Sequence, residues 1–345
     1  MRAVVFGGPG VVELADVPTP GAPEGGLLLR TGANTVCGTD VRIIRGEKSA
    51  GIDVGVVLGH EIAGEVVELG AGVEGFAEGD RIGINPTVPC GRCAYCRLGR
   101  ENLCSDSAIF GYALNGGLAE YVAVPAEAIS RGGVFVAPPE VTYSSIALAE
   151  PLGCVLGAAE SYGIAPGETV VVLGAGPIGL LHTQVARLAG AGRVVVSDPS
   201  ESRREVASRL GATDVVDPTS TDLREHVLSL TDGLGADVAV VAIGIPALFA
   251  QALTVVRKRG RVNAFAGFPK GVSAEVDPNL VHYNELTVTG ASNSRRVDHE
   301  RALGLIASGA IDVASLVTHE YALEDAVEAI EFSAGGEGIK VSVHP

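Results

Sequence analysis

The sequence predicts a two-domain α/β protein, in which a doubly wound parallel sheet is joined to a β-rich domain. Three observations predict this class. The chain has 345 residues, more than one hydrophobic core usually organises. Residues 1 to about 149 contain short apolar runs separated by Gly, Pro, Asp and Asn. From about residue 150, strand and helix patterns alternate, which indicates a parallel sheet with crossover helices.

The first domain is expected to be a partly antiparallel, barrel-like assembly, because its apolar runs are short and closely spaced by turn residues. The expected strands are Arg2–Phe6, Val11–Val17, Gly26–Thr31, Ile62–Leu69, Arg81–Ile84 and Ala119–Val124.

The second domain, residues 150–289, is expected to hold six parallel strands, since β-branched runs there alternate with helical patterns. The expected strands are Thr169–Leu173, Arg193–Ser197, Asp214–Val216, Asp237–Ala242, Arg261–Ala266 and Leu286–Thr289. The expected helices are Ile178–Leu188, Glu201–Leu210, Asp222–Thr231 and Ala247–Arg257. The tail, residues 290–345, contains helical stretches at Asp298–Ser308 and Ala322–Ala334 and a final strand at Ile339–His344. Because six strands complete a nucleotide-binding domain, we expect this tail to return to residues 1–149.

A glycine-rich turn follows the first strand of the second domain and leads into a helix. Strand, turn and helix is the context in which this pattern predicts dinucleotide binding. Gly174 permits the tight turn, Gly176 lets the backbone approach a pyrophosphate, and Gly179 lets helix and strand pack closely. Pro177 and Ile178 lie between the second and third glycines and are expected to contact the cofactor, and the N-terminal N–H groups of the helix that follows would face the phosphates.

A carboxylate ends the next strand at Asp198, 19 residues past Gly179, about where the ribose 2′-hydroxyl of NAD is held. The 2′-phosphate of NADP would meet a like charge there, at a cost of about 4 kcal/mol for ~4 Å and an effective dielectric of ~20. Arg203 and Arg204 lie nearby and could reduce this penalty, or one could stack on the adenine or face water. The sequence therefore favours NAD over NADP.

Four cysteines lie within 15 residues, with spacing that favours a tetrahedral metal site. Four thiolates leave no open position, so such a zinc site would be structural; an iron–sulfur cluster or metal-free reduced thiols are the alternatives. The four residues are Cys90, Cys93, Cys96 and Cys104.

Further candidate metal ligands are scattered through the first domain and the start of the second. They are Cys37, His60 with the adjacent Glu61, and Glu150. Taken singly, each has an ordinary structural explanation: a buried small thiol, a hydrogen-bonded histidine, or a Glu-Pro turn. The residues alone therefore leave a second metal site open.

These motifs together resemble the zinc-containing medium-chain dehydrogenase/reductase superfamily, in the branch of sorbitol (polyol) and threonine dehydrogenases. The resemblance runs nearly end to end, because the motifs occur in the family's order. They are Cys37-Gly38-Thr39-Asp40, Gly59-His60-Glu61, the Cys90–Cys104 lobe, Glu150-Pro151 and the Gly174–Gly179 loop.

The resemblance implies a GroES-like catalytic domain, residues 1–149 and 290–345 with a zinc lobe at about 85–105, and a Rossmann domain, with the active site in the cleft. It implies a catalytic zinc at Cys37, His60 and Glu150, with Glu61 as a nearby or exchanging ligand. One thiolate, one neutral imidazole and one carboxylate would bring a Zn²⁺ site to zero net charge. We therefore expect Glu61 to bind zinc mainly when substrate is absent. The resemblance also places the backbone of Ala266 and Gly267 against the nicotinamide carboxamide.

The chemistry implied is hydride transfer between a secondary alcohol and the nicotinamide, since zinc makes a bound alcohol more acidic. Thr39 would begin the relay that removes the alcohol proton; the alternative is a hydroxyl that caps a helix start. Many relatives have histidine five residues after the metal cysteine, where this chain has Arg42. Arginine is no base near neutral pH. The relay would therefore pass through ribose hydroxyls and water, or Arg42 would serve the cofactor phosphates.

The amino-acid composition limits the binding partners that we expect for this protein. The net charge is −16, the pI is about 4.9 and no basic cluster is present, which argues against nucleic acid and anionic membranes. The uncharged stretch Val238–Val256 is broken by Gly244 and Pro246, so a buried strand and helix are expected there instead of a membrane span. Met1–Pro9 lacks the apolar core of a signal peptide, and we expect a cytoplasmic protein.

The leading hypothesis is a zinc-dependent, NAD-dependent dehydrogenase with two zinc ions per chain, acting on a small secondary alcohol or its ketone. Glu150 instead of cysteine at the third ligand position points to both the polyol and the threonine branches. A polyol or cyclitol-type substrate is the leading expectation, and oxidation of an amino alcohol such as L-threonine is the alternative. A protein of another class, a catalytically idle nucleotide-binding sensor, would be marked by loss of the open metal site. Analogy with the family suggests a homodimer or homotetramer.

Overall fold

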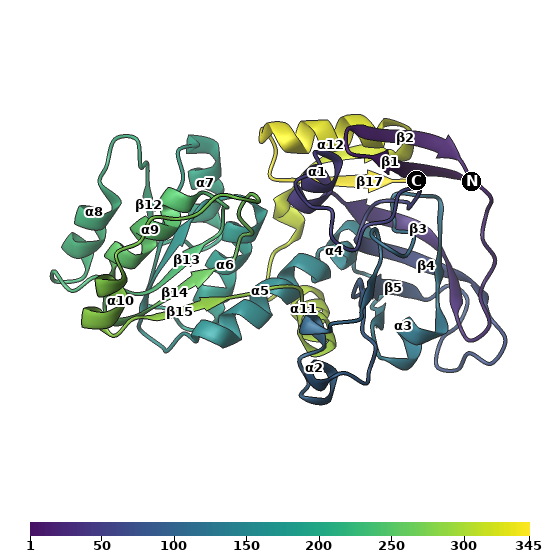
Figure 1. The fold of residues 1–345 in the computed structure, drawn as a ribbon, viewed down its shortest axis with the longest axis horizontal. Coiled ribbons are helices and arrows are strands. Elements are labelled where there is room, and N and C mark those ends of the chain that lie inside the picture. The colour runs from purple at the N-terminus through teal and green to yellow at the C-terminus, as the bar shows by residue number, and fades with distance from the viewer. The chain divides into compact units, whose positions relative to one another are not determined.

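The computed structural model describes residues 1–345 and divides the chain into two compact units. Unit 1 comprises Met1–Gly153 and Asn293–Pro345, and unit 2 comprises Cys154–Ser292. The sequence places the two boundaries at 149/150 and 289/290. The C-terminal tail belongs to unit 1, where its last strand, β17 (Lys340–His344), pairs with a strand near the N-terminus (Figure 1).

Unit 1 is built on a seven-stranded sheet with the order β16-β17-β3-β4-β5-β9, in which β8 pairs with β3. Its pairings are antiparallel except for β16 with β17. Two further pairs, β1 with β2 and β6 with β7, form separate two-stranded sheets. The strands besides β17 are β1 (Arg2–Gly8), β2 (Val11–Asp16), β3 (Leu27–Thr35), β4 (Glu61–Leu69), β5 (Arg81–Ile84), β6 (Thr87–Val88), β7 (Ala108–Ile109), β8 (Tyr121–Val124), β9 (Val134–Ala137) and β16 (Val317–Ala322).

Besides a small cluster of Ala3, Val57 and Ala119, unit 1 has two large hydrophobic clusters. One packs β1, α1, α12 and β17 together, around residues such as Ile43, Leu58 and Val343. The other lies among β3, β4, β5 and β8, around Leu29, Ile62 and Phe110. The helices of this unit are α1 (Gly38–Ile44), α2 (Ala94–Arg97), α3 (Ala126–Ser130), α4 (Tyr143–Ala147), α11 (Arg296–Ala307) and α12 (Ala326–Gly335), with short 3-10 turns at Glu101–Leu103, Ala314–Leu316 and Leu323–Asp325. Helix α5 (Ala149–Tyr162) begins in unit 1 and ends in unit 2.

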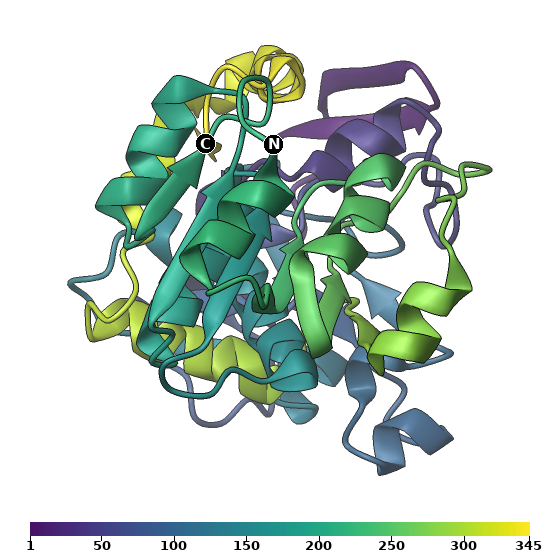
Figure 2. The same ribbon diagram turned by 90° about the vertical axis from the view of Figure 1, so that its left-hand side faces the viewer.

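Unit 2 is a doubly wound parallel sheet with the order β12-β11-β10-β13-β14-β15. In order of appearance within the unit this is 3-2-1-4-5-6, the arrangement of dinucleotide-binding folds. The strands run between helices of the same unit (Figure 2). The strands are β10 (Thr169–Leu173), β11 (Arg193–Ser197), β12 (Asp214–Val216), β13 (Ala236–Val241), β14 (Val256–Ala264) and β15 (Thr287–Gly290), and the helices are α6 (Pro177–Leu188), α7 (Glu201–Arg209), α8 (Leu223–Leu230), α9 (Pro246–Val255) and α10 (Pro278–Asn284).

The sheet of unit 2 is apolar on both faces, as expected for a parallel sheet covered by helices. All five residues of β10 are buried. Val171 and Leu173 belong to the cluster that includes α8 and α9, and the intervening Val172 lies beneath the start of α6. A continuous run of β-branched residues therefore suits this strand.

Three sequence-based expectations are wrong. The helix expected through Arg257 ends at Val255, because β14 begins at Val256 and starts five residues before the expected strand. The helix expected from Ala322 begins at Ala326, after strand β16 and a 3-10 turn. Strands β6, β7, β9 and β16 were not expected at all. None of the helices has the length and apolar character needed to cross a membrane.

Candidate metal centre and dinucleotide site

The antiparallel pairing of β3 with β4 brings Cys37, His60 and Glu61 together. Thr35, at the end of β3, pairs with Glu61 at the start of β4, so residues just beyond these ends lie side by side. The possible ligand atoms of Cys37, His60 and Glu61 all lie within 4.8 Å of one another. His60 and Glu61 are buried and Cys37 is partly buried.

The backbone at Gly59, the residue before His60, has a conformation and a space that require glycine. Its φ is +95°, and a Cβ atom there would stand 2.6 Å from Asn34 Oδ1 and 2.8 Å from the Leu118 backbone nitrogen. Only glycine adopts this conformation in so little space. The residue therefore fixes the path by which the chain delivers His60 to the cluster.

Asp40 links the cysteine and the histidine. Its Oδ2 accepts a 2.9 Å hydrogen bond from the Cys37 N–H at the start of α1, and its Oδ1 lies 3.2 Å from His60 Nδ1. Burial by itself lowers the pKa of His60, but the charges of Asp40 and Cys37 outweigh burial and raise that pKa well above its ordinary value. A carboxylate at Nδ1 leaves Nε2 to bind metal, the usual arrangement for a metal-bound histidine.

Lys340 is a buried partner of Glu61 that the sequence did not reveal. Its Nζ lies 2.5 Å from Oε2 and 2.7 Å from Oε1 of Glu61, and the Thr35 hydroxyl also donates to this carboxylate. Burial lowers the pKa of Lys340, but the charges of Glu61 and Cys37 outweigh burial and raise it. Glu61 is thus held by a fixed cation and a hydroxyl.

The register of β17 explains how Lys340 reaches this position. Ser342 pairs with Thr35 of the antiparallel strand β3, and the Val36 N–H donates to the Val341 carbonyl. Two residues before Ser342, Lys340 therefore comes opposite Cys37, which is two residues past Thr35. A lysine at the start of the short final strand, beside Val341, was the only sequence signal.

Glu150, Thr39 and Arg42 are placed differently from the three converging residues. Glu150 lies in the first turn of α5 and is 9 % exposed, but its carboxylate is not part of the group within 4.8 Å. Thr39 is the second residue of α1, whose N-cap is Cys37, so the alternative of a capping hydroxyl at Thr39 does not hold. Arg42 lies in the last turn of α1, with Nε 4.0 Å from Glu47 Oε2.

The Cys37 cluster fits a divalent metal with borderline-soft character. A thiol, an imidazole and a carboxylate are the ligand types that zinc prefers in catalytic sites. His60 Nδ1 and Asp40 Oδ1 are buried side-chain atoms without a well-aligned hydrogen bond. A metal on the opposite nitrogen would orient this imidazole, so the residues present fit zinc.

The four-cysteine lobe around α2 also fits zinc. The Sγ–Sγ distances are 3.5 Å between Cys93 and Cys96, 3.9 Å between Cys93 and Cys104, and 4.0 Å between Cys90 and Cys96. Tetrahedral Zn–S bonds of about 2.3 Å require S–S distances of about 3.8 Å. The Cys96 N–H donates to Cys93 Sγ and lowers the pKa of that thiol to about 6. The pKa of Cys90 is lowered as well, by backbone N–H groups, whereas burial raises the pKa of Cys96 to about 12.

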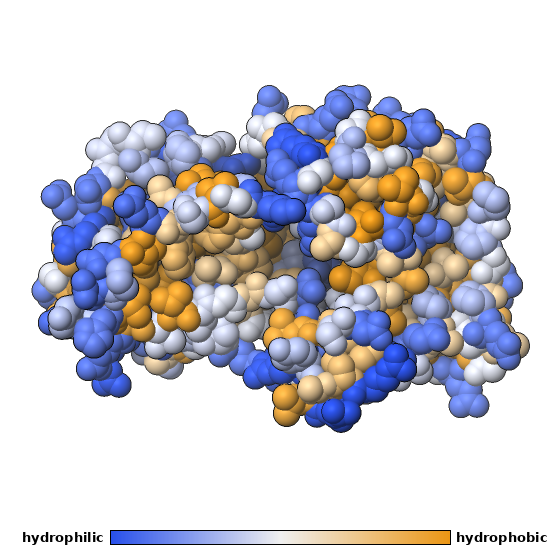
Figure 3. Space-filling view, in the orientation of Figure 1, coloured by the Kyte–Doolittle hydropathy of each residue, from blue (hydrophilic) through white to orange (hydrophobic).

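The surface of the lobe is mixed in character. In Figure 3 hydrophilic residues cover much of it, beside apolar ones. Tyr95, Leu98 and Leu103 are exposed there.

The glycine loop of unit 2 has the conformation that close packing requires. Gly174 has a φ of +102°, and a Cβ at Gly179 would stand 1.8 Å from the Gly174 carbonyl oxygen. A Cβ at Gly176 would meet nothing within 4 Å, so the loop is open there. Pro177 and Ile178 lie in the first turn of α6, which begins one residue before the expected start at Ile178.

Asp198 is fixed beside this loop. Its Oδ2 accepts a 2.7 Å hydrogen bond from the Ala175 N–H, and its Oδ1 accepts a 2.8 Å bond from the Ser200 N–H. Arg204 donates to the backbone carbonyls of Asp198 and Pro199 and lies 3.4 Å from Asp217. The guanidinium of Arg204 is therefore engaged within the unit.

The other predicted cofactor residues lie at strand ends or on α7. Arg203 is half-buried on α7. Ala266 follows β14 and donates its N–H to the Val241 carbonyl at 3.1 Å. The Gly267 carbonyl lies against Gly244, where a Cβ would stand 2.3 Å from it.

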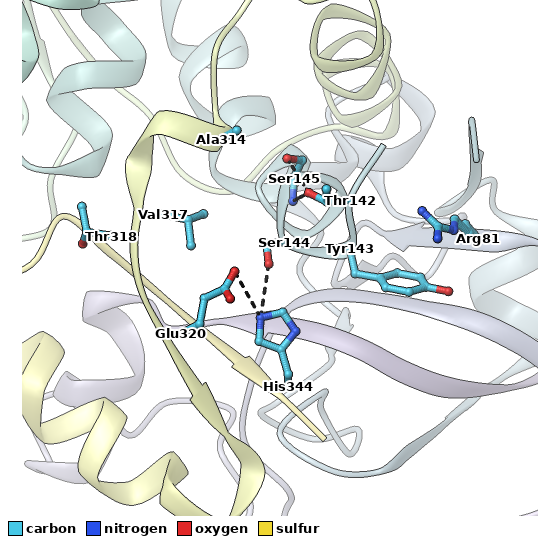
Figure 4. Close-up of a pocket in the computed structure, with 10 residues that line it drawn as sticks. All are labelled: Arg81, Thr142, Tyr143, Ser144, Ser145, Ala314, Val317, Thr318, Glu320 and His344. Atoms are coloured by element: carbon cyan, nitrogen blue, oxygen red, sulfur yellow. Dashed lines mark hydrogen bonds and ion pairs between the residues drawn. The ribbon is translucent and has the colours of Figure 1, made fainter. Parts of the chain in front are cut away.

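A separate cavity of about 750 Å³ in unit 1 contains none of the predicted site residues (Figure 4). Its polar groups bond to one another. Ser144 Oγ lies 2.9 Å from Ser342 Oγ and 3.4 Å from His344 Nε2, and His344 Nδ1 lies 3.0 Å from the Gly32 carbonyl. We therefore place the candidate site at the Cys37 cluster and not in this cavity.

Comparison with known proteins identifies the family. Residues 23–132 match the alcohol dehydrogenase GroES-like domain, and residues 177–308 match the zinc-binding dehydrogenase family. The chain is 35% identical over 346 residues to L-threonine 3-dehydrogenase of Pyrococcus horikoshii, covering 99% of this chain and 97% of that protein. It is 30% identical over 350 residues to sorbitol dehydrogenase of Bacillus subtilis, covering 100% and 97%.

Solved structures of similar fold also include dehydrogenases. A zinc-binding dehydrogenase-like protein from Sinorhizobium meliloti, bound to NADP, has a TM-score of 0.92 at 35% identity, covering 100% of this chain and 99% of that one. The 2R,3R-butanediol dehydrogenase of Bacillus subtilis has a TM-score of 0.89 at 30% identity, with the same coverage. The chain therefore belongs to the zinc-containing medium-chain dehydrogenase superfamily and is a zinc-dependent alcohol dehydrogenase of that type.

Proposed function

We propose that this enzyme oxidises a small secondary alcohol of the polyol or cyclitol type with NAD, and reduces the corresponding ketone in reverse. The observation that carries the proposal is the convergence of Cys37, His60 and Glu61 in unit 1. The glycine loop in unit 2, with Asp198 beside it, supports the dinucleotide as the hydride carrier.

Different residues at the metal centre have different proposed roles. Cys37 and His60 would hold zinc, and Asp40 orients His60 through Nδ1. Lys340 and Thr35 hold the carboxylate of Glu61, which supports the proposal that Glu61 is a temporary ligand and Glu150 the lasting one. When bound, zinc would supply Lewis-acid polarisation of the alcohol or ketone oxygen.

Oxidation of the alcohol releases the proton of its hydroxyl group, and this proton must be carried away from the metal centre. Thr39, in the first turn of α1, is proposed to begin its path. Arg42 cannot accept a proton near neutral pH, so it would not carry this path further and would instead serve the cofactor phosphates.

NAD is proposed over NADP because Asp198 is a buried carboxylate that backbone N–H groups hold at the end of β11. A 2′-phosphate there would meet this negative charge. Arg204, which could offset it, is engaged by backbone carbonyls and Asp217. The Sinorhizobium meliloti relative is bound to NADP, so the ratio of kcat/KM for the two coenzymes in wild type and Asp198→Ala is the direct test.

Oxidation of an amino alcohol such as L-threonine is the second candidate, favoured by the names of several relatives. Identity of 30–36% to both threonine and sorbitol dehydrogenases gives neither substrate precedence.

The experiment has two parts. Metal analysis is expected to give two zinc ions per chain. A panel of sorbitol, xylitol, inositol and L-threonine with NAD is then expected to give the highest kcat/KM for a polyol or inositol. A preference for L-threonine would select the second candidate. No oxidation of any alcohol by zinc-loaded protein would contradict the proposal.

A further inference from the structure

Lys48 and Tyr112 form an unusual pair beside the metal centre. Lys48 Nζ donates a 2.8 Å hydrogen bond to the Tyr112 hydroxyl and lies 4.7 Å from the centre of its ring. The Tyr112 ring in turn meets the His60 ring, with centroids 5.8 Å apart and planes at 67°. A single aromatic ring thus separates the Lys48 ammonium from an imidazole of the metal cluster.

The pair is held in place by its surroundings. Tyr112 is 6 % exposed and packs in a hydrophobic cluster of unit 1. The loop that carries Lys48 folds back on the end of α1, where the Lys48 N–H donates to the Arg42 carbonyl at 3.1 Å. The ammonium is therefore positioned by both the backbone and the phenol.

Lys48 has no carboxylate partner, in a chain with 41 acidic and 25 basic residues. The neighbouring Glu47 is paired with Arg42. Lys340, another lysine of unit 1, differs from Lys48 in this respect, because its ammonium forms an ion pair with Glu61. An ammonium has three donor hydrogens, and only one is used by Tyr112. The Tyr112 oxygen accepts from Lys48, so its own hydrogen remains available to donate.

A positive charge and a hydroxyl donor side by side fit the two oxygens of a carboxylate. Charge-assisted hydrogen bonds of this kind are short and strong, and they discriminate against neutral analogues. A neutral polyol would leave the charge of Lys48 unmatched. The position beside His60 suits a substrate whose carboxylate lies a few carbon atoms from the reacting alcohol.

We propose that Lys48 and Tyr112 bind the carboxylate of the substrate, so that the enzyme prefers polyhydroxy acids to neutral polyols. This inference rests on the proposed function, because it concerns the secondary alcohol oxidised at the same metal centre. It narrows the substrate class from polyols in general to those with a carboxylate.

The test compares gluconate with sorbitol, which have the same carbon chain and differ in the carboxylate. Zinc-loaded wild type is expected to have the higher kcat/KM for gluconate. Lys48→Met should raise KM for gluconate about tenfold to a hundredfold, with little change in kcat and no more than a twofold change for sorbitol. Tyr112→Phe should weaken gluconate less, and Lys48→Arg should restore part of the loss. Lys258→Met, which removes an exposed lysine in unit 2, is the matched control.

Calorimetry of gluconate binding without dinucleotide gives a readout that does not depend on turnover. The affinity of zinc-loaded protein for gluconate should fall by the same factor in Lys48→Met. Equal changes for gluconate and sorbitol, or none, would overturn the inference, as would a loss confined to NAD or NADP affinity, since Lys48 would then serve the cofactor. Oxidation of sorbitol in preference to gluconate would overturn it and leave the proposed function standing. Gluconate binding that depends on Lys48 without oxidation of any alcohol would contradict the proposed function alone.

Discussion

The four-cysteine lobe and the Cys37 cluster differ in how far apart their residues lie in the sequence and in how deeply they are buried. The lobe takes its four thiols from 15 residues, and all of them are partly exposed. The Cys37 cluster takes its residues from the ends of β3 and β4, and its carboxylate is fully buried against Lys340, near the C-terminus.

This difference separates a stabilising role from a reactive one. Four thiolates around Zn²⁺ satisfy the metal completely, and the lobe needs little from the rest of the chain. The Cys37 cluster depends on Asp40, Thr35 and Lys340, which hold the ligands without completing a metal shell. A metal there keeps a position for substrate, and the surrounding charges decide how it is used.

The largest effect that would separate the two clusters is expected from Cys37→Ser. Loss of a ligand at the reactive site should lower kcat/KM by about a thousandfold or more, because Lewis-acid stabilisation is worth several kcal/mol and each 1.36 kcal/mol is tenfold. The zinc content should fall from two ions to one per chain, and the thermal unfolding temperature should change little.

Cys96→Ser is the reciprocal variant. It should also lose one zinc, but the main change should be a lower unfolding temperature and greater susceptibility of the lobe to proteolysis. Equal losses of activity in the two variants at a temperature where both are folded would contradict the division of roles.

The next effect is expected from Lys340→Met, which leaves the carboxylate of Glu61 buried without its cation. Removing one partner of a buried ion pair costs about 3–5 kcal/mol, so urea unfolding of the metal-free protein should show a loss of that order. The double variant Lys340→Met/Glu61→Gln should recover much of it, because no charge is then left unmatched. Lys258→Met controls for the loss of one lysine; additive losses in the double variant would show that the pair is not coupled.

A smaller effect, about tenfold to a hundredfold in zinc affinity or kcat/KM, is expected from Asp40→Asn, in line with other partners of metal-bound histidines. The amide oxygen can still accept the hydrogen bond from Cys37 N–H, so α1 should keep its start. The Cys90–Cys104 site should retain its zinc. Unchanged affinity at the Cys37 cluster would mean that Asp40 does not orient His60.

The sequence predicts local features of the molecule better than distant ones. Strands β5, β10 and β11 match their predicted bounds, because continuous apolar runs end at clear turn residues. The early start of β14 was missed, since Val256 pairs with Ala236 before a register shift that no sequence pattern reveals. Lys340 was missed because its role depends on the pairing of β17 with β3, far apart in the chain. Asp40 and Tyr112 were missed as partners of His60, and Lys48 as a partner of Tyr112, because each contact joins residues that are well separated in the chain.

The smallest effect concerns a buried histidine that, unlike His60, has no charged partner. His299 is 1 % exposed, stacks on Phe135, and has no hydrogen-bond partner at either ring nitrogen. Burial lowers its pKa to about 3 from an ordinary value of 6.5. Between these values the unfolded chain binds a proton that the folded chain does not, so stability falls as pH falls, by about 1.4 kcal/mol per pH unit. In His299→Leu the slope of unfolding free energy between pH 6.5 and 5 should be lower by about that amount, whereas His282→Leu, which removes an exposed histidine, should leave it unchanged. An unaltered slope in His299→Leu would mean that this imidazole is protonated in the folded state, and that the contrast with His60 does not hold.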